Sequence, residues 1–342
     1  MSMKVKILEA FNGDCILINF DQNNILIDGG IGRTYSRKLK NEINRVLERG
    51  EYIDLLIVTH IDDDHIGGIL KLFEDNEIDK SFIKKVWFNS EILMAKHFEN
   101  LDIDPQEIII ENNDSNKMSV RQGYTLEKHL KDLNCWEQSL VMFGNSLMNY
   151  NLAESEITVL TPRQASIEKL RKKWEREKPD TNKMSSCKED YCYSIEELMT
   201  KDFIEDNSIT NKSSISFVFK HEEKQVLFLG DSHPSDVEKS LKELGYSKDK
   251  KLKVECVKLS HHGSKGNTSA SLLELIDCKN YIVSTDGSKH CLPNKESLAR
   301  VVNQTSDNLN FYFNYPIYQN IFTKEELQKY KINCKSLNEL EV

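Results

Sequence analysis

Short apolar runs that end in ligand-type side chains, each followed by a helical segment, recur in this sequence. Three of them, with the residues that follow, are 55–59 with His60, 225–229 with Asp231, and 252–259 with His261 and His262. The first of them, 55–59, is a continuous apolar run of the kind that a strand buried on both faces has. Active sites of layered α/β proteins lie where such strands end. The sequence therefore predicts a layered α/β protein with a site at its strand ends.

The size and composition of the chain fit one α/β core with a sizeable insertion. It has 342 residues, of which 39% are hydrophobic and 30% charged. The longest nearly uncharged apolar stretch, 55–61, is far shorter than the roughly 18 residues needed to cross a bilayer. The N-terminus has no apolar core before a small-residue cleavage site, so we read no signal peptide and expect a cytoplasmic location.

The charge balance restricts the partners. There are 46 Lys and Arg against 55 Asp and Glu, a net charge of −9. This excludes a protein that coats nucleic acid through its overall charge, although a local basic groove is still compatible with it.

The periodicity divides the chain into an ordered first third, a looser middle and an ordered last third. Alternation and turn signals predict strands at 4–8, 15–20, 25–27, 84–88, 215–219 and 281–284, besides the three runs above. Helical spacing predicts helices at 34–49, 66–74 and 236–244. Between 91 and 206 we expect mainly helices, with one strand at 157–160. We therefore predict an α/β domain from 1–90 and 207–323, an insertion or cap subdomain at 91–206, and a C-terminal tail at 324–342.

The motif His60-x-Asp62-x-Asp64-His65 is the strongest chemical signal. Imidazole and carboxylate groups are metal ligands, and four of them lie close together here. In an extended backbone His60 and Asp62 can face one metal, whereas the chain must bend to present Asp64 and His65 to a second. The alternative is an acidic turn with incidental histidines. A calcium loop fits less well, because it uses oxygen ligands and no histidine.

At this point the sequence resembles a known family. The motifs Asp28-Gly29-Gly30, THIDDDHIGG (59–68), LFLGD (227–231) and KLSHHGSKGNTS (258–269) occur in the order expected of metallo-β-lactamase-fold hydrolases. Within that superfamily the chain resembles the competence-type, ComEC/Rec2-related branch, over residues 4–90 and 209–303. The resemblance implies a metallo-β-lactamase-like αββα sandwich, in which helices flank two mixed β-sheets. The insertion would then be large and partly helical, and a dinuclear metal site would lie at one sheet edge.

The resemblance also implies ligands for the two metals. His60 and Asp62 would serve one metal, and Asp64 and His65 the other. Asp231 matches the carboxylate that bridges both. Two further ligands are expected, namely His261 at the next strand end and His290, although His290 stands in Lys-His-Cys-Leu-Pro rather than the usual Gly-His-Pro.

Other matching residues are expected around these ligands. Asp28 usually holds ligand histidines in this superfamily, as outer partners of metal sites do. Asn211 matches an Asn-x-Ser of the competence branch, where it either reaches the site or is a turn residue. His262 is our candidate for protonating the leaving oxygen or contacting a phosphate, or else a structural histidine. Ser264 and Lys265 lie in a loop rich in donors, where Lys265 can meet an anionic substrate.

The remaining histidines carry weaker signals. None ends a strand in a context that matches a further ligand. We expect His97, His129 and His221 to be ordinary surface residues. His233, two positions after Asp231, is a further candidate for the pocket.

The residue types favour phosphoester chemistry. Three carboxylates, those of Asp62, Asp64 and Asp231, favour Mn²⁺ or another hard cation, while Zn²⁺ also fits. Two metals about 3.5–4 Å apart suit phosphoester hydrolysis, in which a hydroxide bridging them attacks phosphorus. We therefore predict a dinuclear phosphodiesterase or nuclease that uses two Zn or Mn ions.

The partners follow from this prediction. The substrate would be a phosphoester such as a nucleic acid or nucleotide. We expect no membrane partner, and the insertion could bind another protein. The alternatives are a small-molecule hydrolase of the same fold, acting on a thioester, lactam or lipid-type phosphoester, and a non-catalytic partner-binding module.

Overall fold

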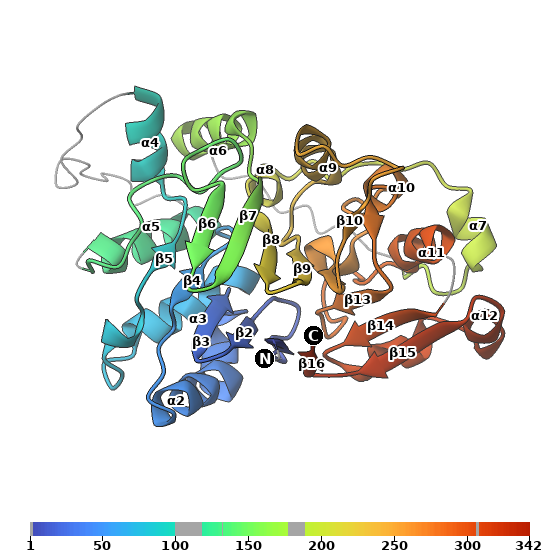
Figure 1. The fold of residues 1–342 in the computed structure, drawn as a ribbon, viewed down its shortest axis with the longest axis horizontal. Helices are drawn as coiled ribbons and strands as arrows, with labels where there is room; N and C mark the ends of the chain where they lie inside the picture. Colours follow the sequence, from blue (N-terminus) through green and yellow to red (C-terminus); the bar gives the residue numbers. More distant parts are fainter. Residues whose placement is uncertain (1–2, 100–117, 132, 177–188, 306–307) are drawn as a thin grey trace.

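The computed structural model describes residues 3–99, 118–131, 133–176, 189–305 and 308–342, and strands from both ends of the chain build its first sheet (Figure 1). The strand order is β16-β1-β2-β3-β4-β5. The strands are β1 Met3–Ile7, β2 Ile16–Phe20, β3 Asn23–Ile27, β4 Leu55–Ile57, β5 Val86–Trp87 and β16 Glu339–Glu341. Pairing is antiparallel from β16 to β3 and parallel from β3 to β5.

The second large sheet has the order β15-β14-β13-β11-β9-β8-β7-β6. Its strands are β6 Asn149–Leu152, β7 Ser155–Thr161, β8 Ser216–His221, β9 Lys224–Phe228, β11 Cys256–Lys258, β13 Asn280–Val283, β14 Leu309–Phe313 and β15 Ile332–Ser336. Pairing is antiparallel from β6 to β9 and parallel from β9 to β15. A separate two-stranded sheet pairs β10 Leu252–Lys253 with β12 Ile276–Asp277.

The two large sheets pack face to face. Successive side chains along a strand point alternately into the core between the sheets and into a core on the outer face. In β3, Ile25 and Ile27 belong to a shared core with Phe217 and Phe219 of β8. The intervening Leu26 belongs to a different core on the outer face of the first sheet. Alternation with period two is what a strand with two covered faces requires.

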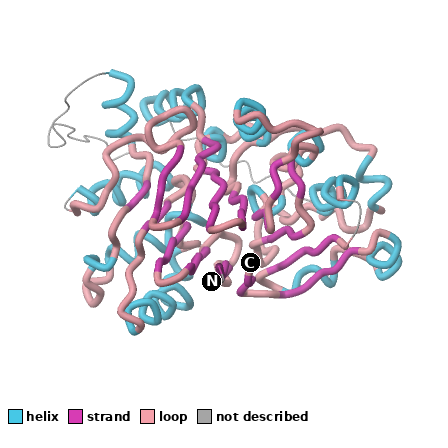
Figure 2. Tube along the Cα trace, in the orientation of Figure 1, coloured by secondary structure: helices cyan, strands magenta, loops and turns pink. Residues whose placement is uncertain are grey.

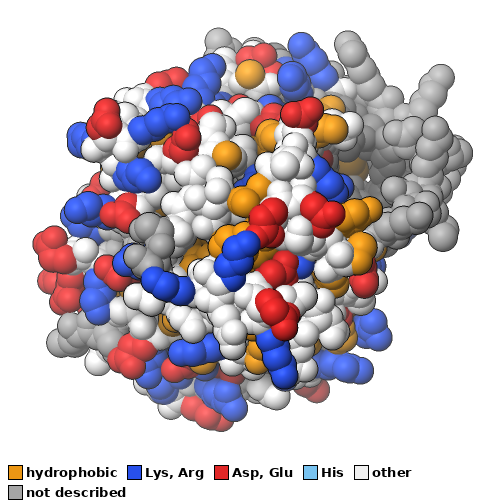
Figure 3. All heavy atoms as spheres, turned by 90° about the vertical axis from the view of Figure 1, so that its right-hand side faces the viewer, with side chains coloured by type: hydrophobic (Ala, Val, Ile, Leu, Met, Phe, Trp, Pro, Cys, Tyr) orange, Lys and Arg blue, Asp and Glu red, His pale blue; other side chains and the backbone are white. Residues whose placement is uncertain are grey.

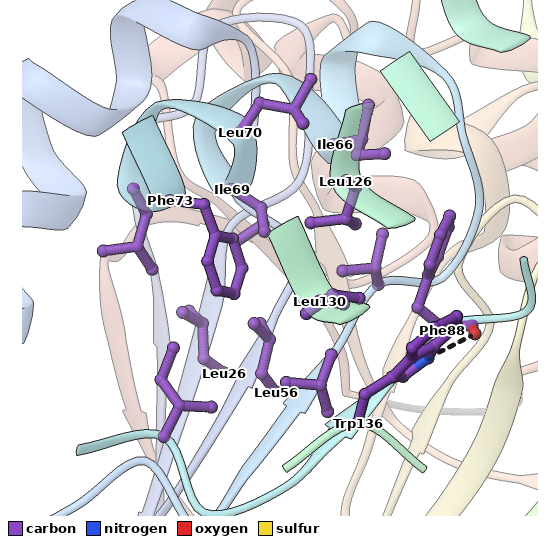
Figure 4. Packing of buried hydrophobic residues seen from close by; sticks show 14 of the residues in the cluster. Leu26, Leu56, Ile66, Ile69, Leu70, Phe73, Phe88, Leu126, Leu130 and Trp136 are labelled. Atoms are coloured by element: carbon purple, nitrogen blue, oxygen red, sulfur yellow. Dashed lines mark hydrogen bonds between the residues drawn. The ribbon is translucent and has the colours of Figure 1, made fainter. Parts of the chain in front are cut away.

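Helices cover both outer faces (Figure 2). On the first sheet they are α1 Gly32–Thr34, the π-turn η1 Tyr35–Leu39, α2 Lys40–Glu48, α3 Asp63–Glu74 and α5 Met118–Lys131. Figure 4 shows α3 and α5 packing side chains such as Ile69 and Leu130 against Leu26 and Leu56 of the sheet. Trp136 Nε1 donates to the carbonyl of Phe88 at 3.3 Å beside them.

The remaining helices lie on the second sheet or between elements. They are η2 Lys80–Phe82, α4 Glu91–Glu99, α6 Gln164–Arg176, α7 Ile195–Met199, α8 Ile209–Lys212, α9 Pro234–Glu243, η3 Ser260–Gly263, α10 Ala270–Leu273, α11 Lys295–Gln304, η4 Pro316–Asn320 and α12 Lys324–Lys329. Among them, α9, α10 and α11 bury their apolar faces in the outer core of the second sheet. The α/β sandwich predicted from the sequence is therefore confirmed.

The predicted division into segments differs from the structure in two places. The strand expected at 157–160 is present as β7, but β6 and β7 extend the second sheet rather than lying outside it. Part of 91–206, including 100–117 and 177–188, lies outside the described residues. The tail, 324–342, supplies β15 and β16, one edge strand to each large sheet. Such strands close sheet edges that would otherwise be left open.

One predicted strand is also divided. The run 252–259 forms β10 and β11, which belong to different sheets, because the chain leaves the first pairing at Val254.

Surface and helix properties agree with the composition. On the face in Figure 3, acidic and basic side chains are interspersed, with no broad area of one sign. Among the helices of the described ranges, none combines the length and apolar character that crossing a bilayer requires.

Candidate metal centre

The residues of the first motif, 59–65, form the end of a strand, a bend and the start of a helix. His60 follows β4 after Thr59, Asp62 is extended with ψ 143°, and α3 begins at Asp63. Asp64 and His65 therefore lie in the first turn of α3, where the helix dipole favours carboxylates. The chain therefore bends between Asp62 and Asp64, as expected from the sequence.

Two glycine contacts bring the neighbouring loops against this turn. A Cβ on Gly68 of α3 would lie 1.9 Å from the carbonyl oxygen of Gly29, and one on Gly13 would lie 1.9 Å from that of Asp64. Only glycine permits such backbone approach. The loops at 12–14 and 28–30 are thereby held beside Asp64 and His65.

Asp28 fixes the ring of His65. Its Oδ2 accepts from Nδ1 of His65 at 2.8 Å, and the same carboxylate accepts from the Thr59 N–H at 2.8 Å and the Thr59 hydroxyl at 2.6 Å. Asp28 is fully buried and has φ 55°, a left-handed conformation that aspartate tolerates better than most residues. Because Nδ1 donates to Asp28, Nε2 of His65 has a free lone pair when the ring is neutral.

The hydroxyl of Thr59 determines the tautomer of His60 in the same way. It has one proton, which it donates to Asp28, so it must accept from Nδ1 of His60 at 3.0 Å. Nε2 of His60 is then also unprotonated in the neutral ring and free to bind a cation.

The two histidines after β11 follow this pattern. Nδ1 of His262 donates to the carbonyl of Ser284 at 2.8 Å, and Nδ1 of His261 lies 3.1 Å from Oδ1 of Asn267, which can only accept. Both histidines are left-handed, with φ 47° and 55°. Consecutive non-glycine residues in this region are strained, and such strain persists where the surroundings over-determine it, often at functional sites.

The four imidazoles converge on Asp231, which follows β9. Oδ2 of Asp231 lies 3.4 Å from Nε2 of His65, 3.8 Å from those of His60 and His261, and 3.9 Å from that of His262. Nε2 of His60, His65 and His262 and Oδ1 of Asp231 are buried and have no hydrogen-bond partner among the described residues. Buried polar atoms normally have partners, so this set fits bound cations.

Two groups of ligand atoms are close enough to share a cation. One is His60, His65 and Asp231, and the other is Asp64, His65 and His262. Asp64 lies 3.6 Å from Nε2 of His262 and accepts from Nδ2 of Asn12 at 2.9 Å. Asp62 lies at the open side, with Oδ2 3.7 Å from Nε2 of His60 and a side chain that is 29% exposed.

The close contacts between these imidazoles and carboxylates shift their pKa values. Burial alone would lower the pKa of His65, but the carboxylates of Asp231 and Asp28 raise it well above its usual value. Burial likewise opposes charge on His262, but Asp14 and Asp231 raise its pKa to about 9. Burial, and then the positive charge of His65, lowers the pKa of His60. Asp231 would have a raised pKa through burial, but His65 and the other imidazoles bring it well below the usual range.

The structure brings most of the predicted site residues together. Asn211 lies beside the centre, since its Nδ2 donates to Asp206 at 2.7 Å and lies 3.3 Å from Nδ1 of His261. Ser264 and the exposed Lys265 follow η3 on the adjacent loop. His290 differs, because it lies on an exposed turn and belongs to neither group of ligand atoms found in the described ranges. His262 belongs to one of these groups, together with Asp64 and His65.

The four histidines outside the predicted ligand set differ in their exposure to solvent. His97 is exposed and His129 partly exposed, as expected. The expectation for His221 was wrong, because it is buried at the end of β8 with Nδ1 2.9 Å from the hydroxyl of Ser155. His233 is buried as well, with Nε2 3.5 Å from Asp206.

Three functional candidates escaped the sequence analysis. Asp14 and Lys258 form a buried ion pair, and Oδ1 of Asp14 lies 3.4 Å from Nδ1 of His262. Oδ2 of Asp206 lies 3.6 Å from Nδ1 of His261 and 3.5 Å from Nε2 of His233, and it accepts a hydrogen bond from Nδ2 of Asn211 at 2.7 Å. Asp14 follows the Asn12-Gly13 turn signal, but a single carboxylate after a turn has no distinctive spacing.

One segment of the chain matches the model of a known protein family. Residues 8–98 match the family model of the Metallo-beta-lactamase superfamily. No curated protein matches the chain. Among solved structures, the chain is similar to the metallo-beta-lactamase fold protein YhfI from Bacillus subtilis, with 12% identity, all of both chains covered and a TM-score of 0.44.

Two other solved structures carry different descriptions. Igni18, a metallo hydrolase from the archaeon Ignicoccus hospitalis, is 11% identical over 100% of this chain and 98% of its own, with a TM-score of 0.43. A mutant of the CmlA beta-hydroxylase is 10% identical over 100% of this chain and 53% of its own, with a TM-score of 0.42.

The family match shows that residues 8–98 are similar to the metallo-beta-lactamase superfamily, and the two-sheet architecture agrees with the fold predicted from the sequence. The comparisons do not identify a branch of that superfamily.

Proposed function

We propose that this protein is a dinuclear metal-dependent phosphodiesterase or nuclease. The observation that carries the proposal is the convergence of four imidazoles on Asp231, three of them with a buried and unpartnered Nε2. The motif resemblance to the competence-type branch supports the same reaction class.

The donor set divides naturally between two cations. His60, Asp62 and His261 would hold one, and Asp64, His65 and His262 the other, with Asp231 between them. When bound, two divalent ions would supply Lewis acidity toward a phosphate and lower the pKa of a water molecule.

The protein's own contribution is to orient these groups beforehand. Asp28, Thr59, Ser284 and Asn267 each accept a hydrogen bond from Nδ1 of one of the four histidines, so every Nε2 is directed at the centre. Outer partners of this kind typically change metal affinity or activity 10–100-fold when removed. The site therefore needs little rearrangement to bind cations.

Two features favour a phosphoester over other substrates. Asp62, Asp64 and Asp231 supply oxygen donors, which suit the hard cations of phosphoryl chemistry. Lys265 is exposed on the loop after η3, where a cationic side chain favours an anionic substrate. Among the four imidazoles, His261 has a side chain 25% exposed and is the most accessible to such a substrate.

An activity screen tests the proposal. Purified protein loaded with Mn²⁺ or Zn²⁺ would be assayed on bis-p-nitrophenyl phosphate, single- and double-stranded DNA, RNA and a β-lactam, with Asp231→Asn as the inactive control. We expect metal-dependent cleavage of phosphodiesters that the variant lacks. Cleavage of the lactam alone would instead favour the small-molecule hydrolase. Metal binding without any cleavage would favour the non-catalytic module.

A further inference from the structure

Phe11 is held next to the metal centre by contacts on both sides. Its neighbour Asn12 donates to Asp64 at 2.9 Å. The N–H of Phe11 donates to the hydroxyl of Tyr315 at 2.8 Å, and its carbonyl accepts from the N–H of Asp286 at 2.8 Å. The position of Phe11 beside Asp64 is therefore fixed through its backbone.

The conformation of Phe11 has a cost that packing does not explain. Its φ is 62°, a left-handed value that costs of the order of 1–3 kcal/mol in a bulky residue. Its side chain belongs to none of the three hydrophobic cores of the described residues. An aromatic ring is thus held at the rim of the site without a role in the core.

Two arginines lie over this ring. The guanidinium carbon of Arg33 is 5.0 Å from the ring centre, and that of Arg37 is 5.4 Å away. Both residues are exposed and lie in α1 and η1, which pack on α3, the helix whose first turn contains Asp64. The arginines and the ligand Asp64 therefore belong to one packed unit.

Neither arginine has a carboxylate within ion-pair distance in the described part of the chain. The nearby carboxylates have other partners, since Glu9 pairs with Lys38 at 2.5 Å and Asp286 accepts from the N–H of Ser288 at 2.9 Å. The two positive charges, which have no carboxylate partner among the described residues, lie over one ring and repel each other. An anion bound by both guanidiniums would offset this repulsion.

We propose that Phe11, Arg33 and Arg37 form an anion clamp that binds a phosphate of the substrate next to the one at the metal centre. The inference rests on the proposed function and specifies the substrate as a phosphodiester chain rather than a single ester. A guanidinium stacked on an aromatic ring keeps its N–H edge free for bidentate contact with phosphate oxygens. A single strand fits this arrangement, because its phosphates are accessible and its bases can stack on an aromatic side chain.

Binding of a phosphorothioate hexathymidylate, which resists hydrolysis, tests the clamp directly. Fluorescence anisotropy would compare full-length protein with Arg33→Ala/Arg37→Ala and with the control Arg45→Ala/Arg49→Ala, which removes two exposed charges from α2 and its end. We expect binding at least about tenfold weaker in the first variant only. The salt dependence of log K should also become shallower by about 0.7, which is the contribution of the one single-strand phosphate contact that is lost.

A conservative variant and a hydrolysis assay separate the outcomes. Arg33→Lys/Arg37→Lys should keep the salt dependence but bind at intermediate affinity, because lysine retains charge without the bidentate edge. Wild-type affinity and slope in the double alanine variant, or no binding by the wild type, would overturn the clamp. Selective loss of binding without hydrolysis of any phosphodiester by the wild type would support the clamp and contradict the proposed function.

Discussion

Oδ2 of Asp231 lies 3.4 Å from Nε2 of His65, and this pair joins the two sheets of the protein at the metal centre. Asp231 follows β9 of the second sheet, whereas His65 lies in α3, which covers the first. A backbone hydrogen bond from Ile215 to Thr59, 3.0 Å long, ties the same two halves together. The centre therefore depends on the register between both halves of the sandwich.

The support of His65 by Asp28 predicts the effect of Asp28→Asn. Asparagine tolerates the left-handed backbone but cannot accept all three hydrogen bonds that the carboxylate accepts. We expect metal affinity to fall roughly 10–100-fold with the fold retained. Isothermal titration with Mn²⁺ and circular dichroism would measure this, with the exposed Asp79→Asn as control. Unchanged affinity would show that Asp28 does not support the ligands.

The role of His262 can be decided by comparing it with Asp64. Asp64→Ala should abolish phosphodiesterase activity and reduce metal content while the protein remains folded. Because Nε2 of His262 faces Asp64 at 3.6 Å, we expect His262→Ala to lose metal as well. Elemental analysis of both variants measures this. If His262→Ala kept its metal and lost roughly 10²–10⁴-fold in rate, it would act as a general acid instead.

Proton competition predicts that metal binding strengthens as the pH rises. In the metal-free protein His262, with a pKa raised to about 9, holds a proton at neutral pH, and the raised pKa of His65 has the same effect. A cation must displace these protons, so affinity should increase up to about pH 9. Titration calorimetry in buffers of different ionisation enthalpy should show proton release. Binding independent of pH would contradict the assigned ligands.

The same shift predicts an opposite trend for stability without metal. The pKa of His262 lies above its usual 6.5 in the folded protein. Its protonation therefore stabilises the metal-free fold fully below pH 6.5, and this contribution is lost as the pH rises through about 9. Urea unfolding in the presence of a chelator should show the free energy of unfolding falling over that interval. A rise over the same interval would contradict the assignment.

The buried pair of Lys258 and Asp14 predicts a large effect of Lys258→Met. Their side chains are 1% and 3% exposed, so the substitution removes the lysine charge from a buried carboxylate whose Oδ1 lies 3.4 Å from Nδ1 of His262. We expect a loss of about 3–5 kcal/mol in the free energy of unfolding, with partial recovery in Asp14→Asn/Lys258→Met. Lys4→Met, which breaks an exposed pair with Glu339, should cost less than about 1 kcal/mol. Equal losses in the two lysine variants would refute this reading.

Much of the site could be predicted because its residues follow buried strands. The apolar runs before His60 and Asp231 are continuous, and the run before His261 is interrupted by charged residues, but the structure has strands at all three places within a few residues. The edge strands were missed for the opposite reason. β15, Ile332–Ser336, is largely polar and exposed, so its residues show no apolar pattern.

The remaining differences arise from backbone geometry that spacing does not encode. Left-handed conformations at His261 and His262 turn both imidazoles toward Asp231. His262, rather than the expected His290, therefore belongs to a group of possible ligand atoms in the described ranges. Asp206 was assigned to the insertion, yet its carboxylate contacts Asn211 and the loop of His261. Such contacts between distant loops depend on the packed fold and have no local signal.

The most direct test of the central claim is metal stoichiometry in wild type and Asp231→Asn, measured together with phosphodiester hydrolysis. Asp231 is the carboxylate that faces all four imidazoles. The dinuclear assignment predicts two divalent ions per wild-type chain, metal-dependent cleavage of bis-p-nitrophenyl phosphate, and loss of both in the folded variant. A variant that retains two ions and the parental rate would contradict it.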